Sequence, residues 1–491
     1  MDTFYAILKT IGLILVVLLS FNIIIFVHEL GHFLAARWRG LHVDRFQIWF
    51  GKPIWKKTIN GVQYGLGWIP AGGFVALPQM APMESIEGGN SDREKPLPPI
   101  KPIDKIIVAF AGPLFSFLLA VVAALIIWKA GTPDRGNSEQ QVGYVKQESP
   151  AAKAGFQLGD KITKINGEPV IGFSGDLESI MNKIIFSEGE TIEFTVERET
   201  NGNTEEITIN SGYEAAEGNF FQRSGMRTIG IAPIEKIFIR GLVEGGPAEL
   251  CNFKVDDQIL SVEGETVLSS YHFIDLIKKN GDKLITVVVK RDGKEISVPT
   301  MALTPTNKYK AHKDAKVQPM LGVQLGGGVK EQELIYPSPA KQIGDSGKMM
   351  WITIKKVTSP KSGIGIEHLS GPVGISKVQY RLLGTDYPVR YLLYFWVLFN
   401  VNLAIFNLLP FPVLDGGHIV MAAGEMIRKK PINTRALEYI QTFFVLILLS
   451  LFFYVTVKDL FSNDTGEKPN REGLPENPEY DLQKLKDALP K

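Results

Sequence analysis

Apolar residues in this chain are gathered into four long blocks that are separated by mixed or polar sequence. The blocks run over residues 11–33, 106–128, 391–409 and 443–457, and the last can be extended back to Ile440. Each block is close to the ~20 residues that a helix needs to cross the hydrocarbon core of a bilayer. The pattern predicts a multi-pass α-helical membrane protein with about four transmembrane helices.

Glycine, proline and β-type residues dominate the sequence after the first block. Residues 46–51 and 64–77 are rich in aromatic and aliphatic side chains broken by glycine and proline, which is not a helical pattern. We expect a membrane-associated β-hairpin loop, because irregular backbone at membrane depth must line a cavity or be covered by protein. A hairpin on the cytoplasmic surface is the alternative, since hairpin signals do not fix depth. Residues 78–102 are polar and proline-rich, which predicts a linker.

An internal repeat fills much of the segment between the second and third blocks. The first copy contains S-P-A-A-K-A-G at residues 149–155 and G-D-K-I-T-K-I-N-G at residues 159–167. The second copy is displaced by the distance from Pro150 to Pro247. Both copies resemble PDZ domains, which are α+β modules that bind an extended peptide by adding a strand to a sheet edge. A pair of modules that binds nothing and acts as a steric plug is the alternative.

Composition and charge exclude several classes of protein. At 491 residues the chain is too long for one domain, and its net charge of +1 gives no field that favours nucleic acid. Cys251 is the only cysteine, so an internal disulfide and a zinc site of several cysteines are both excluded. We expect Cys251 to be an ordinary core residue.

The first apolar block is expected to be retained as a membrane helix. It is longer than the apolar core of a signal peptide, and Ala35-Ala36 followed by Arg37 makes a poor cleavage site. Basic residues cluster after the first block and between the third and fourth, and such clusters favour the cytoplasmic side. We therefore expect both termini and residues 130–388 to lie outside the cytoplasm.

A metal-binding motif ends the first apolar block. His28 and His32 are four residues apart, so on a helix both imidazoles lie on one face and can reach one metal ion. Glu29 lies beside them, where a carboxylate can take a proton from an attacking water. Ionisable groups are costly at membrane depth, which favours a metal site over a polar cluster without chemistry.

A third ligand is expected at the end of the third block. Asp415 follows two helix-breaking prolines in glycine-rich sequence, and a carboxylate with two histidines is a common catalytic zinc set. His418 is the rival ligand. Asn407 is a candidate donor to a developing oxyanion or to substrate backbone, and hydrogen bonding between helices is its alternative role. Small residues at 109–113 predict close packing of the second helix.

Together these motifs resemble the site-2 protease family of intramembrane zinc metalloproteases, of the regulator of sigma-E protease type. The resemblance rests on H-E-L-G-H, on N-L-L-P-F-P-V-L-D-G-G-H at residues 407–418 and on the PDZ-like repeat, and it spans about residues 5–460. The implied site consists of His28, His32 and Asp415 as Zn²⁺ ligands, Glu29 as the base, and Asn407, Pro410, Pro412, Gly72, Gly73 and Phe74 as residues that shape substrate binding.

The resemblance also implies a substrate class and a location. Members cleave membrane-spanning regulators such as anti-sigma factors that have already been cut outside the membrane. The expected location is the bacterial inner membrane, with the PDZ-like domains on the periplasmic side, lipid as a partner and no nucleic acid. The expected segments begin with the first membrane helix at 1–38, the β-loop with its proline-rich linker at 39–102 and the second membrane helix at 103–130. The two PDZ-like domains are expected at 140–225 and 226–305, followed by a linker with an amphipathic segment at 306–388. The third and fourth membrane helices are expected at 389–424 and 436–461, and a polar tail at 462–491.

Two other classes of function remain open from the sequence. A non-catalytic membrane receptor would use the PDZ-like modules to sense peptide ends, but the presence of both Glu29 and Asp415 argues against a degenerate site. A transporter could use intramembrane histidine and aspartate, but it would leave the PDZ-like pair unexplained, and the inverted repeat of many transporters is missing.

Overall fold

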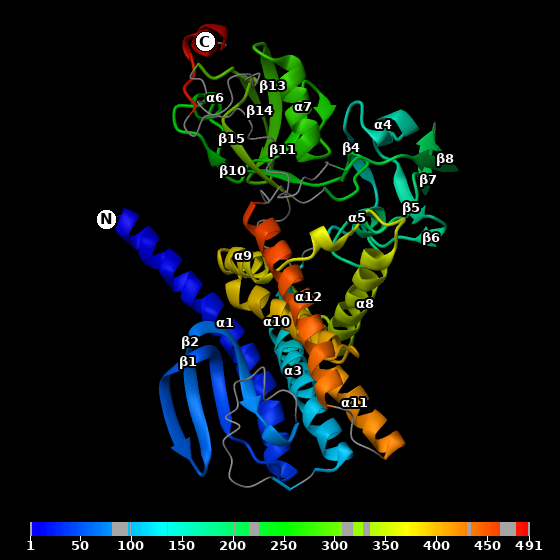
Figure 1. The fold of residues 1–491 in the computed structure, drawn as a ribbon. Helices are drawn as coiled ribbons and strands as arrows, with labels where there is room; N and C mark the ends of the chain where they lie inside the picture. Colours follow the sequence, from blue (N-terminus) through cyan, green and yellow to red (C-terminus); the bar gives the residue numbers. More distant parts are fainter. Residues whose placement is uncertain are drawn as a thin grey trace. The chain divides into compact units, whose positions relative to one another are not determined.

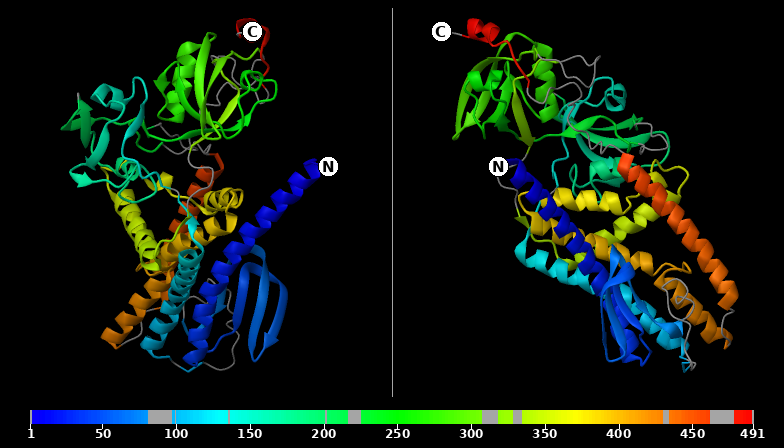
Figure 2. Two further views of the ribbon diagram at one scale, coloured as in Figure 1. Left: turned by 180° about the vertical axis from the view of Figure 1, so that it is seen from behind. Right: turned by 60° about the vertical axis from the view of Figure 1, so that its left-hand side comes forward.

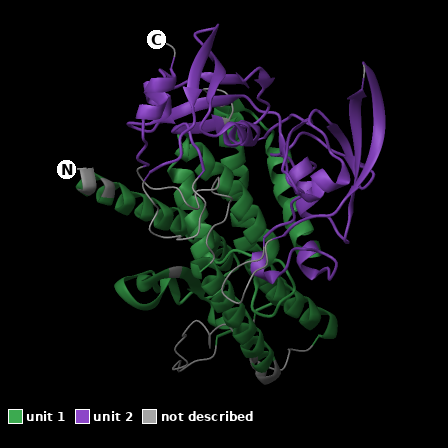
Figure 3. Ribbon diagram, turned by 90° about the horizontal axis from the view of Figure 1, so that it is seen from above, with its two compact units in different colours: residues 1–133, 334–355, 369–461 green, residues 134–333, 356–368, 462–491 purple. Residues whose placement is uncertain are grey.

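The computed structural model of this chain divides into two compact units, coloured separately in Figure 3. The first unit holds residues 1–133, 334–355 and 369–461, and the second holds residues 134–333, 356–368 and 462–491. Most of the predicted 78–102 linker and residues 462–477 of the tail lie outside the described residues. The structure describes residues 2–80, 97–98, 100–134, 136–200, 202–215, 225–306, 318–327, 334–429, 434–461 and 478–489.

Four helices in the described part of the first unit are long and apolar enough to cross a membrane (Figure 1). They are α1 (Asp2–Trp38), α3 (Pro102–Ala130), α10 (Pro388–Asn407) and α12 (Thr434–Phe461). The prediction of four spans is therefore confirmed by length and composition. The fourth apolar segment, Tyr439–Phe461, lies within the expected segment 436–461 and contains the apolar block 443–457.

Small residues let α3 pack closely against its neighbours, as the sequence predicted. Ala120 and Ala124 of α3 are fully buried in a cluster with Val397 and Val401 of α10. Near the other end of α3, a side chain at Gly31 of α1 would lie 2.4 Å from the Ala111 carbonyl oxygen, so only glycine fits there. Close packing matters here because association between helices in lipid depends on van der Waals contact rather than on the hydrophobic effect.

Helix α9 (Pro372–Leu383) packs inside the first unit. It lies in the segment 306–388, for which the sequence predicted an amphipathic element, and its Gln379 is fully buried and donates to Ser20 of α1 at 2.6 Å. The Asp459 carboxylate of α12 accepts hydrogen bonds from the backbone N–H groups of Gly371 and Gly374 at the start of α9. This unit also contains η1 (Pro78–Met80), β3 (Thr132–Pro133), β16 (Leu334–Ile335), which pairs with β3, α8 (Pro339–Thr358) and α11 (Asp415–Arg428).

Two long antiparallel strands lie along α1 (Figures 1 and 2). Strands β1 (Arg45–Ile59) and β2 (Val62–Ala76) fold back on themselves, so residues 45–48 lie between residues 63–66 and residues 73–76. Residues 73–76 therefore form an outer segment, with no further strand paired to them in the described part of the chain.

The second unit is built from two similar sheet modules. In the first, the strand order is β6-β5-β7-β8 and β4 pairs with β9; in the second, it is β14-β13-β11-β10-β15. The first module contains β4 (Val142–Val145), α4 (Pro150–Ala154), β5 (Lys161–Ile165), β6 (Glu168–Pro169), α5 (Ile180–Ile185), β7 (Ile192–Thr200), β8 (Asn203–Ser211) and β9 (Ile231–Pro233). The second contains β10 (Ile237–Leu242), α6 (Pro247–Leu250), β11 (Gln258–Val262), β12 (Glu265–Thr266), α7 (Ser270–Asn280), β13 (Leu284–Arg291), β14 (Lys294–Met301) and β15 (Val323–Gly327).

The repeat seen in the sequence is matched by a repeated ion pair. Asp160 in the first module accepts two hydrogen bonds from Arg198, at 2.7 and 2.8 Å. Asp257 in the second module accepts two from Arg291, each at 2.7 Å. Both aspartate side chains are fully buried. Each pair ties the residue before one strand to the neighbouring strand of the same sheet, β5 to β7 and β11 to β13.

Strand pairing gives both modules wider limits than the sequence predicted. Ile229 and β9, which follow the predicted end at residue 225, pack on the core of the first module, and β15, beyond residue 305, pairs with β10. The tail also contributes, because Leu485 of α13 (Gln483–Ala488) is fully buried against Met301 and Leu303. A short 3-10 helix, η2 (Ile366–His368), completes this unit. The pairing of strands that are far apart in the chain leaves no signal in the local sequence. The sequence therefore predicted narrower limits for both modules than the structure has.

Candidate metal centre

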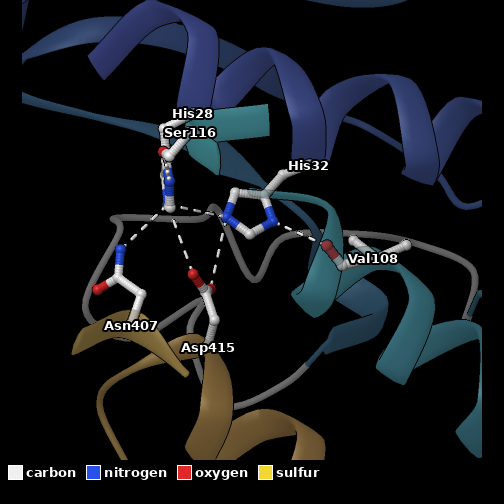
Figure 4. Close-up of polar contacts among 6 residues, drawn as sticks. All are labelled: His28, His32, Val108, Ser116, Asn407 and Asp415. Carbon is white, nitrogen blue, oxygen red and sulfur yellow. Dashed lines mark hydrogen bonds and ion pairs between the residues drawn. The ribbon is translucent and has the colours of Figure 1, made fainter. Parts of the chain in front are cut away.

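Helix α1 presents the two histidines of the motif as the four-residue spacing requires. The Nε2 atoms of His28 and His32 lie 3.3 Å apart, and both side chains are only 12% exposed (Figure 4). One turn of helix separates the residues, so the two rings project from the same face. The pair therefore offers two nitrogen donors that converge on one point.

Asp415 reaches the same point from the other end of the chain. It is the first residue of α11, so its negative charge is also favoured by the helix dipole. The turn before it folds back tightly: a side chain at Gly416 would lie 2.2 Å from the Leu408 carbonyl oxygen, and one at Gly417 would lie 2.0 Å from that of Phe411. The two glycines are needed for this close approach, which fixes the direction of the carboxylate.

The three side chains have the spacing of a zinc site. Asp415 Oδ2 lies 3.4 Å from His28 Nε2, and Asp415 Oδ1 lies 3.4 Å from His32 Nε2. Ligand bonds of about 2.0–2.1 Å in a tetrahedral site place neighbouring donors about 3.3–3.4 Å apart. Among the described residues, these three form the one group of at least three His, Cys, Asp or Glu side chains that could hold a metal. Two imidazoles and a carboxylate are a donor set that zinc accepts, so the site fits the ion.

Helix α3 orients both imidazole rings. His32 Nδ1 donates to the Val108 carbonyl oxygen at 2.8 Å, which leaves the lone pair of Nε2 free to bind metal (Figure 4). His28 Nδ1 lies 2.9 Å from the hydroxyl of Ser116, which is fully buried. A side chain at Gly112 would lie 2.1 Å from His32 Nε2, so glycine is required where the ring passes α3.

Glu29 follows His28 on α1 and lies next to β2 of the hairpin. A side chain at Gly73 of β2 would approach Glu29 Cγ to 3.2 Å and Ile25 Cγ2 to 3.0 Å, so this part of the outer segment contacts α1 beside the site. Gly72 has a φ of +68°, and Phe74 is buried with its ring stacked on Phe50. The structure thus brings Gly73 to the site, while the ring of Phe74 packs within the hairpin.

The end of α10 supplies the remaining predicted residues. Asn407 Nδ2 lies 3.5 Å from His28 Nε2, so its carboxamide borders the site (Figure 4). Pro410 and Pro412 lie in the turn between α10 and α11, where the Pro412 carbonyl oxygen accepts from Gln441 of α12 at 3.0 Å. His418, the rival ligand, is buried one turn further along α11 and is not part of the three-residue group.

Sequence reasoning did not identify Val108, Gly112 or Ser116 as parts of the site. A backbone carbonyl has no sequence signal, and a serine in an apolar helix more often bonds within its own helix. The run A-F-A-G-P was expected to pack closely, but its partner could not be named. The contact of Gly112 with the ring of His32 depends on how α1 and α3 meet.

Comparisons with known proteins match most of this chain. The profile of peptidase family M50 matches residues 16–451. A regulator of sigma E protease from Haemophilus influenzae is 27% identical over 90% of this chain and 97% of its own length. The protease RseP of Yersinia pestis is 27% identical over 86% of this chain and 92% of its own length. A Neisseria meningitidis relative named as a zinc metalloprotease is 29% identical over 84% of this chain and 91% of its own length.

Proposed function

The chain belongs to peptidase family M50, the site-2 protease family of membrane zinc metalloproteases, and from that premise we propose that it cleaves peptide bonds within the membrane-spanning segments of other proteins. The observation that carries this proposal is the group formed by His28, His32 and Asp415, with donor distances of 3.3–3.4 Å. These three residues would hold the zinc ion. Their position at a membrane-spanning helix supports an intramembrane site.

Different residues of this chain would carry out different parts of the hydrolysis reaction. Bound zinc would supply Lewis-acid polarisation of water and of the scissile carbonyl. Glu29 takes the proton of the attacking water and returns it to the leaving amine. Asn407 borders the site and donates an amide N–H to the carbonyl oxygen as negative charge develops on it. Val108 and Ser116 hold the two imidazole rings in the orientation that metal binding needs.

The outer segment of the hairpin supports a path for substrate. A membrane-spanning helix must unwind before a protease can reach its backbone, and the unwound backbone needs hydrogen-bond partners. Residues 73–76 form an outer segment next to Glu29, where an extended substrate can pair by strand addition. Gly72, Gly73 and Phe74 would shape this side of the site, and the turn with Pro410 and Pro412 would shape the part next to Asp415.

The proposed substrates are membrane-anchored regulators, such as anti-sigma factors, that an earlier cut has shortened outside the membrane. Two relatives carry names that refer to sigma-E regulation. The two PDZ-like modules of the second unit would screen such shortened ends, by binding them or as a steric plug. We place the protein in the bacterial inner membrane with these modules on the periplasmic side. A non-catalytic receptor is disfavoured because the chain belongs to a family of proteases.

The proposal is tested with the full chain purified in detergent. The probe is a fluorescent protein joined to a single apolar span of about 20 residues and a short outer tail. Wild type should cleave within the span, and Glu29→Gln should bind zinc but lose at least a hundredfold in kcat, as expected when a general base is removed. His28→Ala should lose zinc. Equal cleavage by wild type and Glu29→Gln would rule out the proposed mechanism.

A further inference from the structure

A strained residue stands at the bend of the hairpin. Trp49 interrupts the pairing of β1 with β2 between Ile48 and Phe50, and it has a φ of +67°. A bulky side chain in this left-handed region is a genuine outlier. Such outliers persist only when the surrounding structure holds them, and bulges beside active sites re-aim a side chain.

The surrounding hairpin is built to hold this conformation. Gln47, which is fully buried, donates its side-chain amide to the carbonyl oxygens of Trp49 at 3.0 Å and of Gly51 at 2.9 Å. Gly67 approaches so closely that a side chain there would lie 2.5 Å from the Trp49 carbonyl oxygen. The buried side chain of Gln47 and the glycine required at position 67 thus both stabilise the bend at Trp49.

The bend directs the indole at α1. The Trp49 Nε1–H donates to the side-chain oxygen of Asn22, and the Asn22 amide in turn donates to the Leu18 carbonyl oxygen at 2.7 Å. In the described part of the chain, this is the one hydrogen bond between α1 and the two strands. Phe46 also packs edge-to-face on Phe26 and Phe33 of α1, so aromatic contact acts together with this hydrogen bond.

The face of α1 that carries Asn22 also carries the catalytic base. Seven residues separate Asn22 from Glu29, which is about two turns, so both lie on nearly the same side of the helix. Gly73 contacts Ile25 and Glu29 on that side. The hairpin is therefore fixed to one face of α1 at two places. One is the hydrogen bond from Trp49 to Asn22, and the other is the close packing of Gly73.

We propose that Asn22 and Trp49 are positioning residues that set the outer segment 73–76 at the distance from Glu29 that an extended substrate requires. This inference rests on the proposed function, because it assumes that substrate pairs with this segment. It predicts that breaking the bond weakens productive substrate binding and leaves the metal site intact. The pair would then determine which substrates are held in register for cleavage.

The test uses the full chain in detergent with the same single-span fluorescent reporter. Trp49→Phe keeps an aromatic ring without the N–H, and Asn22→Leu keeps the volume without the acceptor. Each should raise KM about threefold to tenfold, the range expected for one lost hydrogen bond, with kcat and zinc content unchanged. The double variant should be no worse than the single variants, because both remove the same bond. Trp55→Phe, at an exposed position of the same hairpin, is the matched control and should behave as wild type.

Hydrogen exchange supplies a readout that does not depend on activity. Amides of residues 73–76 should exchange faster in Trp49→Phe and Asn22→Leu than in wild type or Trp55→Phe. Wild-type KM together with wild-type exchange in both variants would overturn the proposal, as would loss of zinc from either. If Glu29→Gln still cleaves the reporter, the proposed function fails instead, and the exchange data still decide whether the pair holds the hairpin.

Discussion

Replacing Gly112 by alanine separates the effect of local helix propensity from that of the metal site. Alanine is favoured over glycine inside a helix by about 1 kcal/mol, so propensity alone predicts a more stable α3. The added methyl group, however, would lie 2.1 Å from His32 Nε2 and 2.5 Å from Cε1 of the same ring. The substitution is therefore expected to damage metal binding in a chain that still folds.

The size of the effect follows from the geometry. Ordinary contact begins at 3.4 Å, so the ring must move by about 1.3 Å or lose its hydrogen bond to the Val108 carbonyl oxygen. Metal–ligand distances tolerate only about 0.2 Å. A misplacement of about 1 Å costs on the order of a hundredfold in rate. We expect zinc affinity and kcat/KM to fall by at least that factor.

Purified protein and a matched control make the test specific. Zinc per chain is measured by atomic emission, cleavage with the single-span reporter, and folding by thermal unfolding followed with circular dichroism. Gly424→Ala in α11 is the control, because a side chain there would meet nothing within 4 Å. It should match wild type in all three measurements. Full zinc content and wild-type cleavage in Gly112→Ala would show that α3 does not fix the ring of His32.

Three further substitutions probe other parts of the structure. Ser116→Ala removes the contact with His28 Nδ1 and should weaken zinc binding about tenfold to a hundredfold in chelator competition; unchanged affinity would mean that this contact does not orient the ring. Gly73→Val crowds the segment beside the base and should lower kcat/KM about tenfold with zinc retained, so loss of zinc would point to a wider disturbance. Asp160→Asn leaves the charge of Arg198 uncompensated and should lower the free energy of unfolding of that module by about 3 kcal/mol, read from hydrogen exchange in β7; unchanged protection would contradict a structural role for this ion pair.

The sequence predicted those parts of the site that depend on helical spacing or on ligand chemistry. His28 and His32 are four residues apart, so a helix brings their rings together without any knowledge of the tertiary fold. Asp415 was inferred from what zinc requires rather than from spacing, and the structure brings its carboxylate to within 3.4 Å of both rings. The four apolar spans followed from length alone.

Features that depend on how distant segments pack could not be read from the sequence. Trp49 sits in a run of β-type residues, and nothing in that run indicates a left-handed bend held by Gln47. Strand β15 joins the second module because it pairs with β10, and Leu485 of the tail is buried because Met301 and Leu303 leave an apolar surface for it. Each of these outcomes is set by a partner far away in the chain.

Helix α3 connects the packing of the membrane helices to the chemistry of the site. Lipid gives no hydrophobic drive for helix association, so α1 and α3 meet through close contacts such as Gly31 against Ala111. The same approach brings Gly112, the Val108 carbonyl and Ser116 to the two imidazoles. The contacts that hold the helices together therefore also orient the rings of His28 and His32, the proposed zinc ligands. A substitution that separates α1 from α3 by even 1 Å must act on zinc binding before it unfolds the protein, because coordination tolerates far less displacement than helix packing does.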